Sequence, residues 1–136
     1  MKKTPLALFL ALGLLHTPLS ALAATAPLDL VQPVSDYKIY VTDQLDELAS
    51  NTQKFTDAVK KGDLVTAKKL YAPTRVYYES IEPIAELFSD LDASIDSRVD
   101  DHEKGVTAPD FTGFHRIEYS LFAENSTQGL DTLADG

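Results

Sequence analysis

The fold is decided by residues 30–62, LVQPVSDYKIYVTDQLDELASNTQKFTDAVKKG. Apolar and aromatic residues recur here in steps of three, four or seven, which predicts one long amphipathic helix. Lys60, Lys61 and Gly62 predict its end, because cations favour the last turn of a helix and glycine favours its stop. The residues that form the apolar stripe are Leu30, Val34, Tyr37, Val41, Leu45, Leu48, Phe55 and Val59.

A second helix is predicted over residues 64–85, where apolar residues again follow helical spacing. Asp63 is a good N-cap for it. Pro73 and Pro83 each remove an intrahelical donor, so we expect kinks or breaks at these two positions.

The rest of the chain predicts shorter helices. The acidic residues 89–96 predict a turn that leads into a short helix, residues 105–113 a loop, and residues 114–123 a last clear helix. No stretch of useful length alternates with period two, so no strand is predicted. Helices with short connections indicate an all-α, up-and-down helical bundle.

The first residues differ in kind from the rest. Lys2 and Lys3 precede an apolar run over residues 6–15, and small residues end it at Ala23. This pattern predicts a signal peptide at residues 1–23, with an uncleaved anchor as the alternative, and a helical domain over residues 24–136. No other stretch is long and apolar enough to cross a bilayer. Residues 129–136 have helical spacing and then stop, so we expect an incomplete domain.

The composition is acidic and contains no cysteine. Lys and Arg number 12 against 21 Asp and Glu, a formal net charge of −9, which becomes −11 once the two leader lysines are removed. This negative charge therefore argues against a polyanion such as nucleic acid as a partner. Thiolate metal sites and disulfides are excluded by the absence of cysteine.

Two pairs of metal-ligating residue types lie at the borders of apolar helix faces. His115 and Glu118 are one helical turn apart, and Glu79 and Glu82 have the same spacing on the second helix. If the faces meet, three carboxylates and an imidazole converge, as in di-iron helical bundles. Such donors suit Fe, Zn, Mn or Cu. The alternatives are an ordinary His–Glu helix pair and solvated acidic faces. His102 is expected in an exposed, charged turn.

Three segments together resemble the imelysin-like family, in particular its EfeO branch. They are YYESIEP at residues 77–83, DLDASID at residues 90–96 and TGFHRIE at residues 112–118. The resemblance implies the first half of a two-half helical bundle, exported to the periplasm for iron uptake. It also implies an inner-membrane iron permease and a haem peroxidase-like protein as partners. By motif, the metal ligands would be His115 and Glu118, completed by Glu79, Glu82 and Asp96, with iron as the first candidate and Zn or Cu as others.

The resemblance is incomplete in two ways, and it leaves other functions open. We expect the leader to run straight into the imelysin-like part, without the cupredoxin-like domain of many EfeO proteins. We also expect the second half of the bundle, with any ligand it supplies, to be absent. A metal-dependent peptidase is one alternative, but neither zincin pattern, H-E-x-x-H or H-x-x-E-H, is present. A protein that binds acidic polysaccharide is another, which the charge of −11 opposes unless metal bridges the two.

Overall fold

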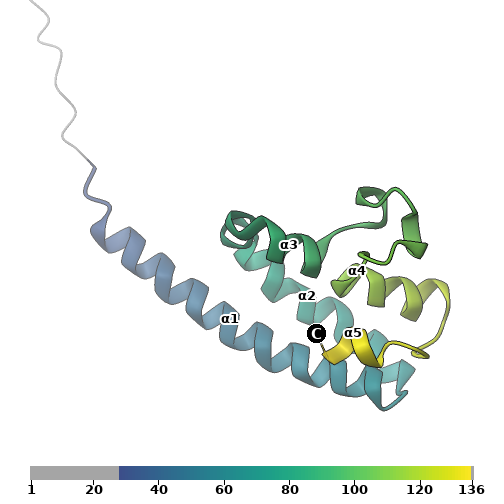
Figure 1. Cartoon of the computed structure of the whole chain (residues 1–136). Helices are drawn as coiled ribbons and strands as arrows, with labels where there is room; N and C mark the ends of the chain where they lie inside the picture. The colour runs from purple at the N-terminus through teal and green to yellow at the C-terminus, as the bar shows by residue number, and fades with distance from the viewer. Residues whose placement is uncertain (1–27, 136) are drawn as a thin grey trace, which may run out of the picture.

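One long helix, α1 (Val31–Lys60), organises the computed structural model, which describes residues 28–135. α2 (Leu64–Ala85) turns back and runs beside the C-terminal half of α1 (Figure 1). α4 (Gly113–Glu118) and α5 (Asp131–Asp135) close the same end of the pair. The remaining elements are η1 (Glu86–Phe88), α3 (Ser89–Asp96), η2 (Val99–Asp101), η3 (Gly105–Thr107) and the π-helical turn η4 (Tyr119–Ala123).

The predicted all-α helical bundle is confirmed. Residues 28–135 contain helices and turns and no strand. Within the same residues, no helix has the length and apolar character needed to cross a membrane. The predicted signal peptide, residues 1–23, lies outside the described part of the chain.

The turn between α1 and α2 follows the predicted stop and start signals. Gly62 takes a left-handed conformation, with φ of 72°. The amides of Gly62 and Asp63 donate to the carbonyls of Val59 and Ala58 at 3.0 and 2.9 Å, which closes α1 with a Schellman motif. The Asp63 carboxylate then accepts from the Thr66 amide at 3.0 Å and so caps α2.

The Asp63 cap predicts a stability difference that depends on pH. The hydrogen bond from Thr66 holds the pKa of Asp63 below its ordinary value, so the cap stabilises the fold above the pKa of the unfolded chain and is lost on acidification. Asp63→Ala should lower Tm at neutral pH, and the difference from the native protein should shrink below about pH 4. Asp63→Asn keeps the cap and should melt close to the native protein at neutral pH. Equal melting of the native and alanine proteins at pH 7 would contradict this role.

Two predictions within this region are corrected in part. α2 continues through Pro73 and Pro83, so the breaks that were expected as an alternative to kinks do not occur. Residues 89–96, expected to be a turn that leads into a short helix, form the short helix α3 themselves. Both prolines are exposed, as are Lys69 and Glu79, whose carbonyls lose their helical donors, so water can bind those carbonyls. Helix packing then outweighs the local cost of each proline.

The core joins α1, α2 and the C-terminal elements. Phe55 of α1 is fully buried, and its ring lies 5.9 Å from Tyr71 of α2 and 6.2 Å from Phe114 of α4. Tyr78 contacts the same Phe114 ring at 6.2 Å. Phe114 is therefore the aromatic residue that fixes α4 to the α1–α2 pair. The other buried members of this cluster are Ala58, Val59, Ala67, Ile117, Leu121, Leu130 and Ala134.

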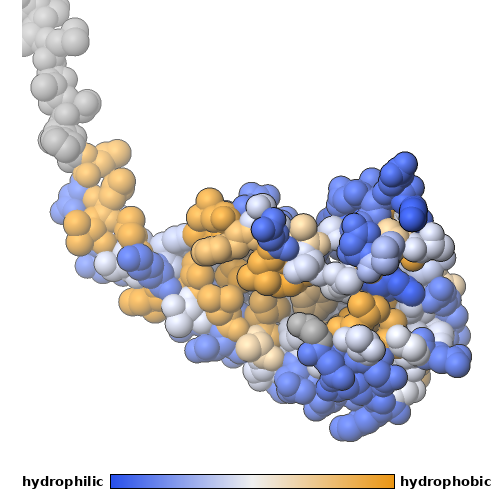
Figure 2. Space-filling model, viewed as in Figure 1, coloured by the Kyte–Doolittle hydropathy of each residue, from blue (hydrophilic) through white to orange (hydrophobic). Residues whose placement is uncertain are grey.

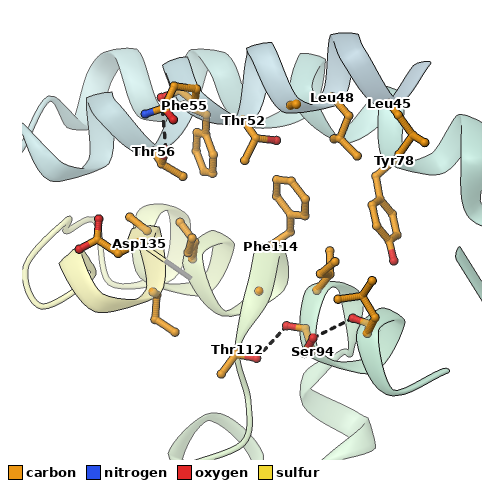
Figure 3. Close-up of a pocket in the computed structure, with 18 residues that line it drawn as sticks. Leu45, Leu48, Thr52, Phe55, Thr56, Tyr78, Ser94, Thr112, Phe114 and Asp135 are labelled. Atoms are coloured by element: carbon orange, nitrogen blue, oxygen red, sulfur yellow. Dashed lines mark hydrogen bonds between the residues drawn. The ribbon is translucent and has the colours of Figure 1, made fainter. Parts of the chain in front are cut away.

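An apolar surface extends from this core along the N-terminal half of α1. Leu30, Val34 and Leu45 are about half exposed, and Figure 2 shows apolar side chains along this arm and over the neighbouring helices. A groove of about 650 Å³ continues this surface between α1, α3 and α4, with Leu45, Leu48 and Phe114 among its lining (Figure 3). Among the described residues, the apolar stripe of α1 is therefore buried only in the C-terminal half of the helix.

Candidate metal centre

The start of α4 is fixed directly against the end of α3. The Thr112 hydroxyl donates to the Ser94 carbonyl at 2.7 Å (Figure 3). Gly113 follows with φ of 72°, and a Cβ atom at this position would lie 2.1 Å from the Ile95 carbonyl oxygen. Only glycine allows this approach. It places Asp96, the last residue of α3, beside His115.

His115 has a carboxylate neighbour at each ring nitrogen. Its Nδ1 lies 2.8 Å from Glu118 Oε2, and its Nε2 lies 3.6 Å from Asp96 Oδ1. Because an ionised carboxylate can only accept, we assign the proton of the neutral ring to Nδ1, which leaves the lone pair on Nε2. Nε2 is buried and has no hydrogen-bond partner within residues 28–135. A histidine that binds metal commonly has this arrangement, with its other nitrogen donating to a carboxylate.

A buried arginine, Arg75, lies beside the candidate metal centre formed by Asp96, His115 and Glu118. The Arg75 guanidinium forms ion pairs with both Glu79 and Asp96, and its side chain is only 8% exposed. It lies over the rings of Phe114 and Tyr78, at 5.5 and 5.6 Å from their centroids. A charge removed from water to this extent needs such partners.

The five predicted ligands are brought together in part. Asp96, His115 and Glu118 are neighbours in a chain of contacts, and Glu79 joins them only through Arg75. Glu82 is half-buried and makes no ion pair or side-chain hydrogen bond with the described residues. In residues 28–135, no three His, Asp or Glu side chains surround one point closely enough to hold a metal ion.

A neighbouring tyrosine was not singled out by sequence reasoning. Tyr71 lies one turn before Arg75 on α2, and its buried hydroxyl has no hydrogen-bond partner among the described residues. Burial raises the pKa of Tyr71, and the nearby Glu118 carboxylate raises it further. The signal was present in the four-residue spacing of Tyr71, Arg75 and Glu79, which places them on one face of a helix.

Tyr78 connects α2 to the acidic segment of α3. Its hydroxyl donates to Asp92 Oδ1 at 2.5 Å. Burial raises the pKa of Tyr78, and this hydrogen bond and the charge of Asp92 add to the shift. Within the DLDASID segment, Asp92 thus positions α3 through Tyr78. Asp96, at the end of the segment, faces the candidate metal centre.

His102 is not the exposed residue that the sequence predicts. Its side chain is 9% exposed, its Nε2 lies 2.9 Å from the Ser97 hydroxyl, and its Nδ1 lies 3.4 Å from Asp110. The ring also packs on Phe111 at 5.1 Å. The loop between η2 and α4 folds over the imidazole, a tertiary contact that local charge does not reveal.

The centre opens to solvent through a second cavity. This cavity measures about 430 Å³, and His115, Glu118, Arg98 and Tyr119 are among its lining residues. η4 begins directly after Glu118 as a π-helical turn, a feature that is frequent at functional sites. His115 and Glu118 therefore border this cavity, whereas Asp96 is not part of its lining.

Comparison with known proteins identifies a family whose sequence pattern this chain matches. A peptidase-family model described as Imelysin matches residues 33–135. The chain is 78% identical over 135 residues to the iron uptake system component EfeM of Pseudomonas syringae pv. syringae. The matched region covers 99% of this chain and 47% of that protein.

EfeO proteins are also similar. The iron uptake system component EfeO of Yersinia pseudotuberculosis is 54% identical over 132 residues, covering 90% of this chain and 35% of that protein. The EfeO of an Escherichia coli O1:K1 strain is 54% identical over 115 residues, covering 85% of this chain and 31% of its own length. The chain thus spans less than half the length of these relatives.

Proposed function

Because the chain belongs to the imelysin family, we propose that it captures a metal ion, with iron as the first candidate, as a component of an uptake system. The observation that carries this proposal is His115, whose buried Nε2 has no hydrogen-bond partner among the described residues and points toward Asp96. An imidazole nitrogen beside a carboxylate oxygen is a donor pair that suits iron, zinc and copper.

The candidate ligands have different roles in this proposal. His115 Nε2 and Asp96 provide the first two donor atoms, and Glu118 orients the imidazole through Nδ1. Glu79, which pairs with Arg75, adds a half-exposed carboxylate at the edge of the site. Glu82 extends the acidic character of the same face of α2.

The cellular setting is part of the same proposal. The relatives carry the name of iron uptake components, which favours capture and delivery over hydrolysis. We place the protein in the periplasm, exported by the leader at residues 1–23, where it would deliver iron to an inner-membrane permease alongside a haem peroxidase-like partner. The peptidase alternative lacks a second histidine in the helix of His115.

Calorimetric titration under anaerobic conditions tests this function. Fe(II) and Zn(II) should each bind the purified protein saturably. His115→Ala should raise Kd at least about 100-fold, because a donor atom is lost, and Glu118→Gln about 10-fold to 100-fold, because the imidazole loses its carboxylate partner.

His102→Ala is the matched control. It removes the other histidine of the described residues, which is also shielded from water but contacts Ser97 and Asp110 and not the centre. Kd should stay within about threefold of the native value, well short of the loss expected at a ligand. Absence of saturable binding in a native protein with a helical spectrum would reject the proposed function.

A further inference from the structure

We propose that Arg75 is a built-in cation which holds the carboxylates of Asp96 and Glu79 in the metal-free protein and competes with a metal ion for them. Arg75 would therefore set the affinity of the centre and its preference for multiply charged ions. This inference rests on the proposed function, since it concerns the same site.

The contacts of Arg75 place it in direct competition. Asp96 Oδ1 forms an ion pair with Arg75 Nη1 and lies 3.6 Å from His115 Nε2. The carboxylate has little access to water, since the Asp96 side chain is 11% exposed. A metal ion bound between Asp96 and His115 would have to take this oxygen from the guanidinium. Arg75 Nη2 also donates to Asp96 Oδ2 at 3.4 Å, so the guanidinium engages both oxygens of this carboxylate and an ion has to take one of them from it.

The surroundings hold the guanidinium in place. Arg75 is 8% exposed and packs over the rings of Phe114 and Tyr78, each on a different helix. Like charges placed close together in such a site repel strongly, because little water screens them. Any bound cation therefore has to overcome the repulsion of Arg75 as well as its pairing with Asp96.

The Arg75 guanidinium also has a second carboxylate partner, which can hold its charge once Asp96 binds a metal ion. Glu79, one turn along α2, already pairs with Arg75 and is 47% exposed. Arg75 can release Asp96 and keep Glu79, so its charge stays paired at the solvent edge. A doubly or triply charged ion gains more from Asp96 than a guanidinium does, whereas a monovalent ion does not. Arg75 would thus exclude sodium and potassium.

Arg75→Gln tests the competition because two readouts should move in opposite directions. Without the guanidinium, Zn(II) should bind roughly tenfold tighter in calorimetry, since like charges set side by side cost at least that much. The metal-free protein should melt at a lower temperature, because Asp96 loses its partner. An arginine with a structural role alone would lower the melting temperature and weaken binding together.

Two further variants complete the experiment. Arg75→Lys keeps the charge but lacks the fork that engages two carboxylates, so its Zn(II) affinity should lie between those of the native and Arg75→Gln proteins. Arg116→Gln removes a cation on α4 that contacts Ser120, and it should leave affinity near the native value. This variant controls for the change in net charge.

The outcomes separate this inference from the proposed function. No saturable Zn(II) binding by the native protein would reject the function itself. Native binding together with equal or weaker binding in Arg75→Gln would overturn the role of Arg75 alone. If Arg75→Gln does not fold, Arg75→Lys decides, and binding no tighter than native would overturn the role.

Discussion

Gly113→Ala is expected to lower the free energy of unfolding by about 3 kcal/mol or more, since it combines backbone strain with a steric clash. Gly113 has φ of 72°, and an added Cβ would lie 2.1 Å from the carbonyl oxygen and 2.5 Å from the carbonyl carbon of Ile95. Both atoms belong to the backbone of α3, so no side-chain rotation can relieve the clash. Urea unfolding followed by circular dichroism measures the loss.

Gly129→Ala is the matched control for this substitution. Gly129 has φ of 76°, yet its added Cβ would meet nothing within 4 Å. The control therefore measures the left-handed conformation alone, which costs about 1 to 2 kcal/mol. Gly113→Ala should exceed it clearly and should also weaken metal binding, because separating α4 from α3 moves His115 away from Asp96. Equal losses at the two glycines would show that the contact with Ile95 is unimportant.

The helices were predictable where local pattern and tertiary packing agree. The stripe from Leu30 to Val59 predicts α1, and the signals at Gly62 and Asp63 locate the turn that follows. The breaks expected at the prolines of α2 do not occur. That expectation considered only the hydrogen bond that each proline removes. Their exposed position, which makes that loss tolerable, is a property of the folded helix pair and not of the local sequence.

The candidate centre was predictable only in part. The spacing of His115 and Glu118 predicts their contact, because residues three apart on a helix are neighbours. The approach of Asp96 depends on how α3 meets Gly113, and this is a contact between segments that local spacing cannot give. Arg75 was missed because its partners Asp96 and Phe114 come from two other helices. His102 was misplaced for the same reason.

Phe55→Ala should destabilise the fold by about 3 to 5 kcal/mol, because it removes a large buried ring and leaves a cavity. Phe55 is 0% exposed and contacts Tyr71 and Phe114, so its loss loosens the junction of α1, α2 and α4. Phe114 immediately precedes His115 and lies under the Arg75 guanidinium. We therefore expect weaker metal binding as well, measured by calorimetry on protein that urea titration shows to be folded.

Phe88→Ala is the matched control, because it removes the same ring from an exposed position. The Phe88 side chain is 61% exposed at the end of η1, so its removal should change the free energy of unfolding by no more than about 0.5 kcal/mol. The contrast tests whether the aromatic cluster around Phe114, and not the number of aromatic residues, stabilises this end of the bundle. A loss at Phe88 as large as that at Phe55 would mean that the exposed apolar surface is covered in solution. A small loss at Phe55 would mean that the junction around Phe114 is loosely packed and cannot hold His115 against Asp96.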